Sequence, residues 1–262
     1  MNIKAVMSSF KQQGIQFLAD PQWIIPSIIA PFMFTIVALY MYGDVDESIM
    51  LTAVLGGGVL GMWGNMLFTS GYSISYDRFN GTIEPIMLTP THLIDVITGR
   101  SIWNTFIGLL NALLVFIFAG LIFGVGMNIS EPLLFAPMLI LTLLSLASIG
   151  LMFAALFVLT RASFVVMTLL EFPIYVFSGA LFPISVLPGV LQPISYVLAP
   201  SWGVDAMKQT AIGESYQSMM GWGVGLDVMM MFILMAVYIA AAYILFKVIE
   251  RNTRISGTLV RY

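Results

Sequence analysis

The sequence has no cysteine, a single histidine and few charged residues. Without cysteine, the chain can form neither a disulfide scaffold nor a thiolate-based metal or redox site. Lysine, arginine, aspartate and glutamate make up 9% of the 262 residues, against about a quarter in an average soluble chain. With 60% hydrophobic residues, too few charges remain for a water-facing surface or for a disordered chain. The net charge of −3 argues against a nucleic-acid partner. The composition is that of an integral membrane protein.

Long apolar stretches without charge predict how the chain crosses the membrane, because a spanning helix needs about 20 apolar residues. We expect six spans, at 23–42, 51–72, 102–123, 134–158, 163–182 and 228–246. Residues 109–118 are apolar on all sides, unlike the alternating strands of a membrane β-barrel. No repeat or linker divides the chain, so we expect one all-α membrane domain over residues 1–262.

The basic residues predict the orientation. With six spans, nine of the ten lysines and arginines fall on the side of the two termini, and Lys208 alone falls on the other. Because basic residues are enriched in cytoplasmic loops, we expect both termini in the cytoplasm. Residues 1–22 lack the apolar core of a signal peptide and predict an amphipathic helix in the cytoplasmic interface. Its apolar stripe consists of Ile3, Val6, Met7, Phe10, Phe17 and Leu18.

Enzymatic groups are scarce. The single histidine, His92, lies in a predicted cytoplasmic loop, so neither a Ser–His pair at membrane depth nor a zinc ligand set can be assembled. No lysine follows a glycine, which excludes the P-loop pattern G-x-x-x-x-G-K-[ST]. We therefore expect no catalytic, cofactor-binding or metal-binding residue in this chain.

Glu171 is the one carboxylate inside a predicted span. An ionisable group at that depth is costly and should face protein or water. It is either a substrate-path or proton-relay residue, or a protonated or hydrogen-bonded packing contact near Pro173, and the sequence leaves both interpretations open. Two G-x-x-x-G pairs, Gly57 with Gly61 and Gly120 with Gly124, favour close helix packing within the chain over a dimer seam.

The connector between the second and third predicted spans contains a segment, residues 76–90, with signals for a short helix. Asn80-Gly81 predicts a turn, and either Thr82 or Glu84 can begin a helix that Thr89-Pro90 ends. Its apolar residues are Ile83, Ile86, Met87 and Leu88. Such a helix is suited to docking onto a soluble partner; the alternative is a membrane-surface helix without a partner.

On the other side, residues 178–200 are apolar and uncharged but contain prolines at positions 183, 188, 193 and 200. These prolines forbid one continuous helix. Short broken helices that re-enter the outer leaflet are predicted, because irregular backbone at that depth must be buried in protein or line a cavity. We expect a lid or extracellular gate formed by Phe182, Pro183, Ile184, Leu187, Pro188, Gln192, Pro193 and Pro200.

Together the two segments resemble the permease subunit of ABC-2 type transporters. The family's loop pattern is an acidic-basic pair, G-T-hydrophobic-E, apolar positions and T-P; here it stands as Asp77-Arg78, Gly81-Thr82-Ile83-Glu84, Ile86-Met87-Leu88 and Thr89-Pro90. Its second signature, S-G-x-x-[FY]-P-I followed by L-P, a Q-x-I step and an apolar residue before proline, is matched by Ser178-Gly179, Phe182-Pro183-Ile184, Leu187-Pro188, Gln192-Pro193-Ile194 and Ala199-Pro200. The sequence departs from the loop pattern at Phe79 and Pro85.

The resemblance implies a six-span permease with a cytoplasmic coupling helix at 82–89 and a broken re-entrant hairpin between the fifth and sixth spans. It implies a homodimer of permease chains in a prokaryotic cytoplasmic membrane, engaging two copies of a separate ATPase that binds ATP and Mg²⁺. It implies export, and the uncharged composition favours amphipathic, drug-like, antibiotic-like or lipid-linked cargo. The alternative is an ATPase-independent secondary transporter or channel that uses Glu171, for which inverted repeats or several intramembrane charges are expected.

Overall fold

The computed structural model describes residues 2–19, 21–42, 47–124, 128–160, 163–219 and 221–256. The regular structure in these ranges is entirely helical, which confirms the predicted all-α class. The elements are α1 (Ile3–Ala19), α2 (Pro21–Tyr42), α3 (Glu47–Phe79), α4 (Ile83–Leu88), α5 (Leu93–Phe123), α6 (Pro132–Leu159), α7 (Ser163–Phe177), the 3-10 helix η1 (Ile184–Val186), α8 (Gln192–Val197), α9 (Ala199–Ile212), the 3-10 helix η2 (Gly213–Ser215) and α10 (Val224–Ser256).

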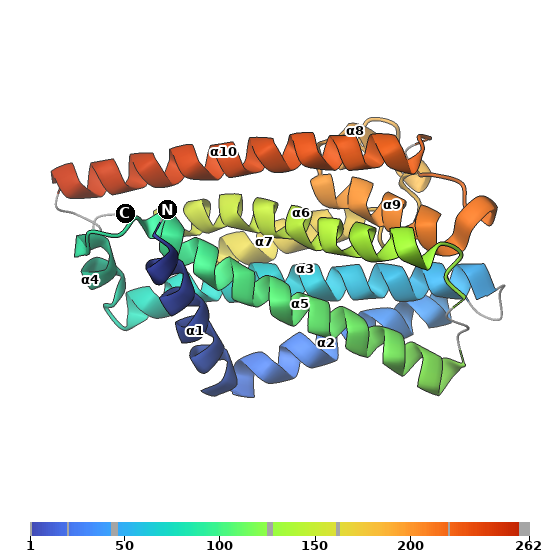
Figure 1. Ribbon diagram of the computed structural model, residues 1–262, viewed down its shortest axis with the longest axis horizontal. Helices are drawn as coiled ribbons and strands as arrows, with labels where there is room; N and C mark the ends of the chain where they lie inside the picture. The colour runs from blue at the N-terminus through green and yellow to red at the C-terminus, as the bar shows by residue number, and fades with distance from the viewer. Residues whose placement is uncertain are drawn as a thin grey trace.

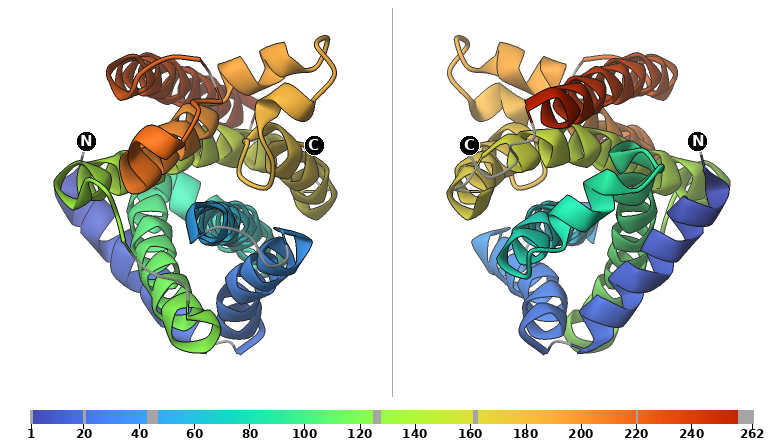
Figure 2. Two further views of the ribbon diagram at one scale, coloured as in Figure 1. Left: turned by 90° about the vertical axis from the view of Figure 1, so that its right-hand side faces the viewer. Right: turned by 90° about the vertical axis from the view of Figure 1, so that its left-hand side faces the viewer.

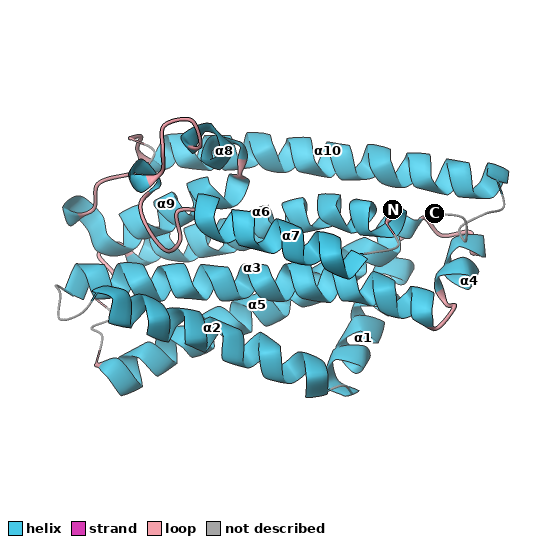
Figure 3. Cartoon of the chain, turned by 180° about the vertical axis from the view of Figure 1, so that it is seen from behind, coloured by secondary structure: helices cyan, strands magenta, loops and turns pink. Residues whose placement is uncertain are grey.

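The long helices lie side by side along one axis (Figure 1). Helix α4, the start of α1 and the end of α10 lie at one end of the molecule, and α8 and α9 lie near the other. Seen along the axis, α6 crosses the middle, with α10 on one side and α2, α3 and α5 on the other (Figure 2). From behind, α7 runs beside α3 and α6 (Figure 3), and both of these helices pack against it.

Each of the six predicted spans overlaps one helix. Among the residues that the structure describes, three helices carry stretches long and apolar enough to cross a membrane: Leu93–Ile122 in α5, Pro132–Leu159 in α6 and Val224–Asn252 in α10. The apolar stretches of α2, α3 and α7 are shorter, at Ser27–Tyr40, Met50–Gly64 and Val165–Phe177. The structure therefore supports a multi-pass arrangement, and the count of six spans stays a prediction.

Several predicted boundaries were wrong. The fifth span does not extend to residue 182, because α7 ends at Phe177 and the chain turns at Gly179, whose φ is +71°. At the α4 end, α3 continues to Phe79, and α5 begins at Leu93 instead of residue 102. Hydropathy marks only the apolar part of a helix, whereas these helices continue through charged residues that are paired in the fold.

The largest departure is α9, in a stretch predicted to be an outer connector. It is almost entirely buried, packs on α6 and α10, and carries the buried Asp205 and Lys208. Because of these charges, the segment was predicted to lie outside the spans, on the side opposite the termini. Pro200, one of the four prolines predicted to forbid a continuous helix, lies in the first turn of α9 after the break that follows α8, where proline costs no helical hydrogen bond.

The N-terminal helix is confirmed, with its predicted apolar stripe divided between two surfaces. Val6 and Phe17 are buried, whereas Ile3, Met7 and Leu18 are exposed. The buried face packs on α5, where polar Ser9 and Gln13 and the small Gly14 are also enclosed. The exposed apolar residues are those available to a membrane surface.

The first G-x-x-x-G pair packs within the chain, as predicted. A Cβ at Gly61 would lie 2.3 Å from the ring of Pro31 in α2, and one at Gly57 would lie 2.7 Å from the Cα of Thr35. In the second pair, Gly124 makes no such close helix contact. It ends α5 with φ +61°, and nothing would lie within 4 Å of a Cβ there. A glycine in that left-handed conformation terminates a helix without strain.

Candidate functional site

The short helix predicted between residues 82 and 89 is present as α4, at the end of the molecule (Figure 1). A turn precedes it, and Gly81 adopts φ +66°, a conformation that side chains of other residues resist. Thr82 is the N-cap residue, and Thr89 ends the helix by donating both its backbone N–H and its hydroxyl to the Ile86 carbonyl, at 3.2 and 2.6 Å.

Asp77 and Arg78 were predicted to lie in the connector; they lie instead in the last turn of α3. Asp77 Oδ2 is 2.6 Å from Nη1 of Arg100 in α5, and both side chains are buried. The other carboxylate oxygen, Oδ1, accepts the Thr82 hydroxyl at 3.0 Å. One buried carboxylate therefore joins the end of α3, the first third of α5 and the start of α4.

Arg78 reaches a different helix. Its guanidinium donates to the backbone carbonyls of Val158 and Thr160 at the end of α6. The last carbonyls of a helix have no partner within the helix, and a positive charge is favoured there by the helix dipole. Arg78 thus joins the end of α3 to the end of α6.

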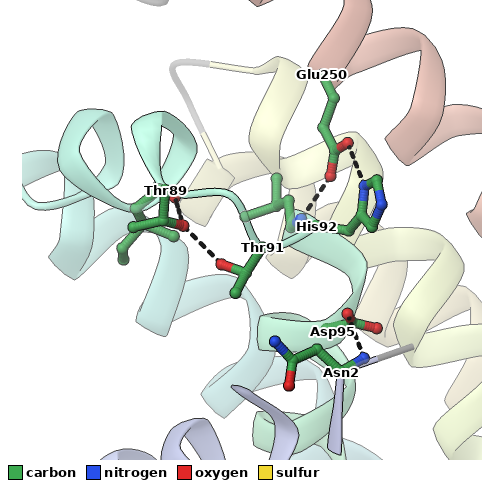
Figure 4. A network of polar contacts seen from close by, with 8 residues as sticks. Asn2, Thr89, Thr91, His92, Asp95 and Glu250 are labelled. Carbon is green, nitrogen blue, oxygen red and sulfur yellow. Dashed lines mark hydrogen bonds and ion pairs between the residues drawn. The ribbon is translucent and has the colours of Figure 1, made fainter. Parts of the chain in front are cut away.

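The other side of α4 is fixed by a second polar network (Figure 4). The hydroxyls of Thr89 and Thr91 are 2.6 Å apart. Glu250 of α10 accepts a hydrogen bond from the backbone N–H of Leu93 and lies 3.0 Å from His92 Nδ1. A carboxylate at the first turn of α5 is favoured by the helix dipole.

The same end of α5 is also joined to the N-terminal helix, because Asp95 Oδ2 accepts the backbone N–H of Asn2 at 2.8 Å (Figure 4). The residues that flank α4 are thus in contact with α3, α5, α6, α10 and α1.

The predicted apolar residues of α4 face two ways. Ile83 is buried and Ile86 is half-buried against the core. Leu88 is 86% exposed, and nearby Phe79 is 91% exposed; Pro85 and Pro90 are exposed as well. The side chains of Glu84 and Met87 lie outside the described residues. Phe79 and Leu88 thus present apolar surface at the α4 end, of a kind that contacts a protein partner or a membrane.

The proline-rich segment forms the short helices that were predicted. η1 and α8 lie between the end of α7 and the start of α9. Ile184, the first residue of η1, and Leu187, which follows it, are buried. Gln192 Nε2 donates to the Leu187 carbonyl at 3.0 Å. The exposed or half-buried members of the predicted gate are Phe182, Pro183, Pro188, Gln192 and Pro193.

Helix α9 fixes the beginning of this segment. Lys208 Nζ donates to the carbonyls of Gly179 and Ala180 at 2.9 and 3.1 Å, and the Ser201 hydroxyl donates to the Phe177 carbonyl at 3.1 Å. A cation thus lies at the end of α7, where the helix dipole favours it. Burial lowers the pKa of Lys208 to about 8, and the Asp205 charge opposes that shift.

Asp205 holds the segment that follows η2, residues 216–219, against α9. Its carboxylate accepts hydrogen bonds from the Tyr216 hydroxyl at 3.0 Å, the Ser218 hydroxyl at 2.6 Å and the Met219 N–H at 2.9 Å. Gln209 donates to it at 3.2 Å and to Asp227 of α10 at 2.6 Å. This cluster was not predicted from the sequence. Its one signal is the placement of Asp205, Lys208 and Gln209 on a single helical face, between Ala199-Pro200 and Gly213.

The sequence matches the family model of the ABC-2 type transporter over residues 4–212, from α1 to the end of α9. The match takes in α4 and the proline-rich segment. The chain belongs to the ABC-2 type transporter family. Comparison with curated proteins gave no match.

As an ABC-2 membrane domain, the chain is a transport component of a membrane, and its apolar helices make it a multi-pass protein. Within the described ranges, no group of three or more histidine, aspartate or glutamate side chains could hold a metal ion. The buried Asp77–Arg100 pair and the buried Asp205 and Lys208 of this ABC-2 domain connect segments near its two ends.

Glu171 of the ABC-2 domain is half-buried in α7 and accepts a hydrogen bond from the Tyr175 hydroxyl one turn further on. The pair lies against α3 at Gly64, where a Cβ would be 2.6 Å from the Tyr175 oxygen. The Tyr175 ring packs edge-on against Phe34 of α2, with centroids 5.1 Å apart. Glu171 therefore lies at the junction of three helices, and its role in packing or in a path stays a prediction.

Proposed function

We propose that this chain is the membrane-spanning permease of an ATP-driven ABC exporter, coupled to a separate cytoplasmic ATPase through α4. The supporting observation is the construction of the α4 end. Leu88 at the end of α4 and nearby Phe79 are exposed apolar side chains, and the residues that flank α4 are in contact with five other helices. A six-residue helix has little stability of its own, so its position depends on those ties.

In this proposal, ATP and Mg²⁺ bind to the partner ATPase, and this chain converts the movement of that partner into movement of helices. Closure of the ATPase dimer pushes on α4 and on α1. The push reaches α5 through the Asp77–Arg100 pair, α6 through Arg78, and α10 through Glu250. Buried ionic contacts suit this role because they hold a defined geometry and are costly to separate.

The proline-rich segment serves as the extracellular gate. Ile184 and Leu187 anchor it in a cluster with Trp202 of α9 and Met231 of α10, while Val186 and Val190 are exposed. Release of cargo requires that this cover move while its first turn is held by Lys208. We further propose a homodimer with two ATPase copies and amphipathic, drug-like, antibiotic-like or lipid-linked cargo, in accord with the low charge content of the chain.

The proposed orientation places the α4 end in the cytoplasm of a prokaryotic cell, with both termini there. The distribution of basic residues supports it. Lys4, Arg78 and Lys247 belong to helix segments at the α4 end, whereas Lys208 belongs to α9 near the other (Figure 1). Basic residues on one side of a membrane protein favour the cytoplasm.

The proposal is tested by purifying the tagged chain in mild detergent from its native host and measuring co-purified P-loop ATPase by mass spectrometry. Leu88→Glu places a charge on the proposed docking surface, and we expect at least a tenfold loss of bound ATPase. Leu133→Glu is the matched control, because Leu133 is 88% exposed at the opposite end of the bundle.

An ATPase that stays bound to the Leu88→Glu variant in wild-type amount would contradict docking at α4. If the purified chain alone transports in vesicles with a proton gradient, and Glu171→Gln abolishes that transport, the secondary-transporter alternative holds instead.

A further inference from the structure

A cavity of about 450 Å³ lies between α5 and α10 at the α4 end of the bundle, with Leu151 of α6 among its lining residues. Helix α10 packs mainly on α6 and α9, and α6 lies between it and α5 (Figure 1). The contacts of Glu250 with His92 and Leu93 lie at the α4 end of this groove (Figure 4). The volume is within the range of small-molecule sites, about 300–1,000 Å³.

The wall of the groove changes from apolar to charged along α10. The apolar residues Ile239, Ala242 and Phe246 line the part of the groove that is farther from α4. Lys247 and Glu250 line the part at the α4 end. From Ile239 to Glu250 the helix rises about 16 Å, which is close to half of the roughly 30 Å thickness of the hydrocarbon core. The groove therefore has the depth and the polarity gradient of one membrane leaflet.

The charged groups at the mouth of the groove differ in the contacts that they make within the protein. Both oxygens of Glu250 are engaged, by His92 and by the Leu93 N–H, and Asp95 accepts the Asn2 N–H. Lys247 is exposed, with its Nζ 6.0 Å from the centroid of the Tyr243 ring. A lysine at membrane-surface level attracts a phosphate group. The mouth thus offers a cation for a phosphate, above a wall suited to an acyl chain.

We propose that this groove binds one phospholipid of the leaflet at the α4 end, with an acyl chain along Ile239 and Phe246 and its phosphate at Lys247. A peptide segment of a soluble partner fits less well, because its backbone N–H and C=O groups would be left without partners against the apolar wall. Binding of the lipid bridges α5 and α10 beside the Glu250 contact, and it does not depend on the proposed ATPase.

The experiment uses the full chain in vesicles of phosphatidylethanolamine and phosphatidylglycerol that contain a phosphatidylethanolamine probe with a photoreactive acyl chain. We expect crosslinks on α10 between residues 239 and 250. A diacylglycerol probe with the same chain lacks the phosphate and should label this site at least fivefold less.

Two variants test the site. Lys247→Glu reverses the cation, and Thr98→Phe fills the groove from α5; each should reduce labelling of α10 at least fivefold. The controls are Lys11→Glu, an exposed lysine on α1, and Ile244→Phe, a residue of α10 that is 59% exposed and does not line the groove.

Equal labelling by the diacylglycerol probe would overturn phosphate recognition, and unchanged labelling of both site variants would show ordinary contact with bulk lipid. Because Lys247 is exposed, its variant keeps the test decisive even if Thr98→Phe fails to fold. Loss of the label only when a partner ATPase is added would assign the groove to that partner and contradict a resident lipid.

Discussion

Replacing Arg100 by methionine removes one partner of the buried ion pair that joins α3 to α5. The side chains of Arg100 and Asp77 are 2% and 5% exposed, so the substitution leaves the Asp77 carboxylate in a dry environment. Loss of one member of such a pair costs about 3–5 kcal/mol. We expect the lower end, about 3 kcal/mol, because Asp77 keeps its hydrogen bond from the Thr82 hydroxyl.

The double variant separates the ion pair from the burial of charge. The Nε and Nη2 atoms of Arg100 are buried without a hydrogen-bond partner in the described part of the chain, so the guanidinium is incompletely satisfied. Replacing Asp77 by leucine together with Arg100→Met should therefore return stability to within about 1 kcal/mol of the wild type. Thr82 keeps the Asp77 backbone carbonyl, at 3.2 Å, as an acceptor in that variant.

The assay is thermal unfolding in detergent, followed by tryptophan fluorescence. For a chain of this size, each kcal/mol corresponds to about 2–4 °C in Tm, so Arg100→Met should unfold roughly 6–12 °C below the wild type. The control is Arg251→Met on the exposed end of α10, where surface substitutions change stability by about 0.5 kcal/mol or less. An Arg100→Met variant with the Tm of that control would refute the reasoning.

Three further predictions concern other parts of the site. Gly81→Ala forces a side chain into φ +66° at about 1–2 kcal/mol, and hydrogen exchange of α4 should become faster than in the wild type, whereas an unchanged rate would contradict the strained turn. The folded-state pKa of Lys208, about 8, lies below its ordinary value of 10.5. Between pH 8 and pH 10.5, Lys208 is therefore protonated in the unfolded chain and deprotonated in the folded chain. Wild-type stability should accordingly rise by about 3 kcal/mol across that pH window, and Lys208→Met should lose this rise in denaturation at pH 8 and pH 10.5. For Glu171→Gln, unchanged cargo transport in vesicles indicates packing with Tyr175, whereas lost transport with normal assembly on size exclusion indicates a path residue.

Local sequence signals determined much of what was predicted. The composition establishes a membrane protein, because the chain has too few charged residues to form a water-facing surface. The bounds of α4 follow from Gly81, Thr82 and Thr89, which act through their own backbone conformations and nearest neighbours. The prolines at 183 and 188 break the outer segment in the same local way, since a proline removes a backbone donor wherever it occurs.

The tertiary structure decided how the charged residues are used. Asp77 meets Arg100 across two helices, Arg78 meets the end of α6 82 residues further along the chain, and Lys208 meets carbonyls 28 and 29 residues before it. From the sequence alone, such charged residues are predicted to be exposed to water. Inside the fold Asp77, Arg100 and Lys208 are buried and Arg78 is half-buried. A partner on a distant segment offsets the cost of removing them from water, and that partner is defined only once the helices have packed.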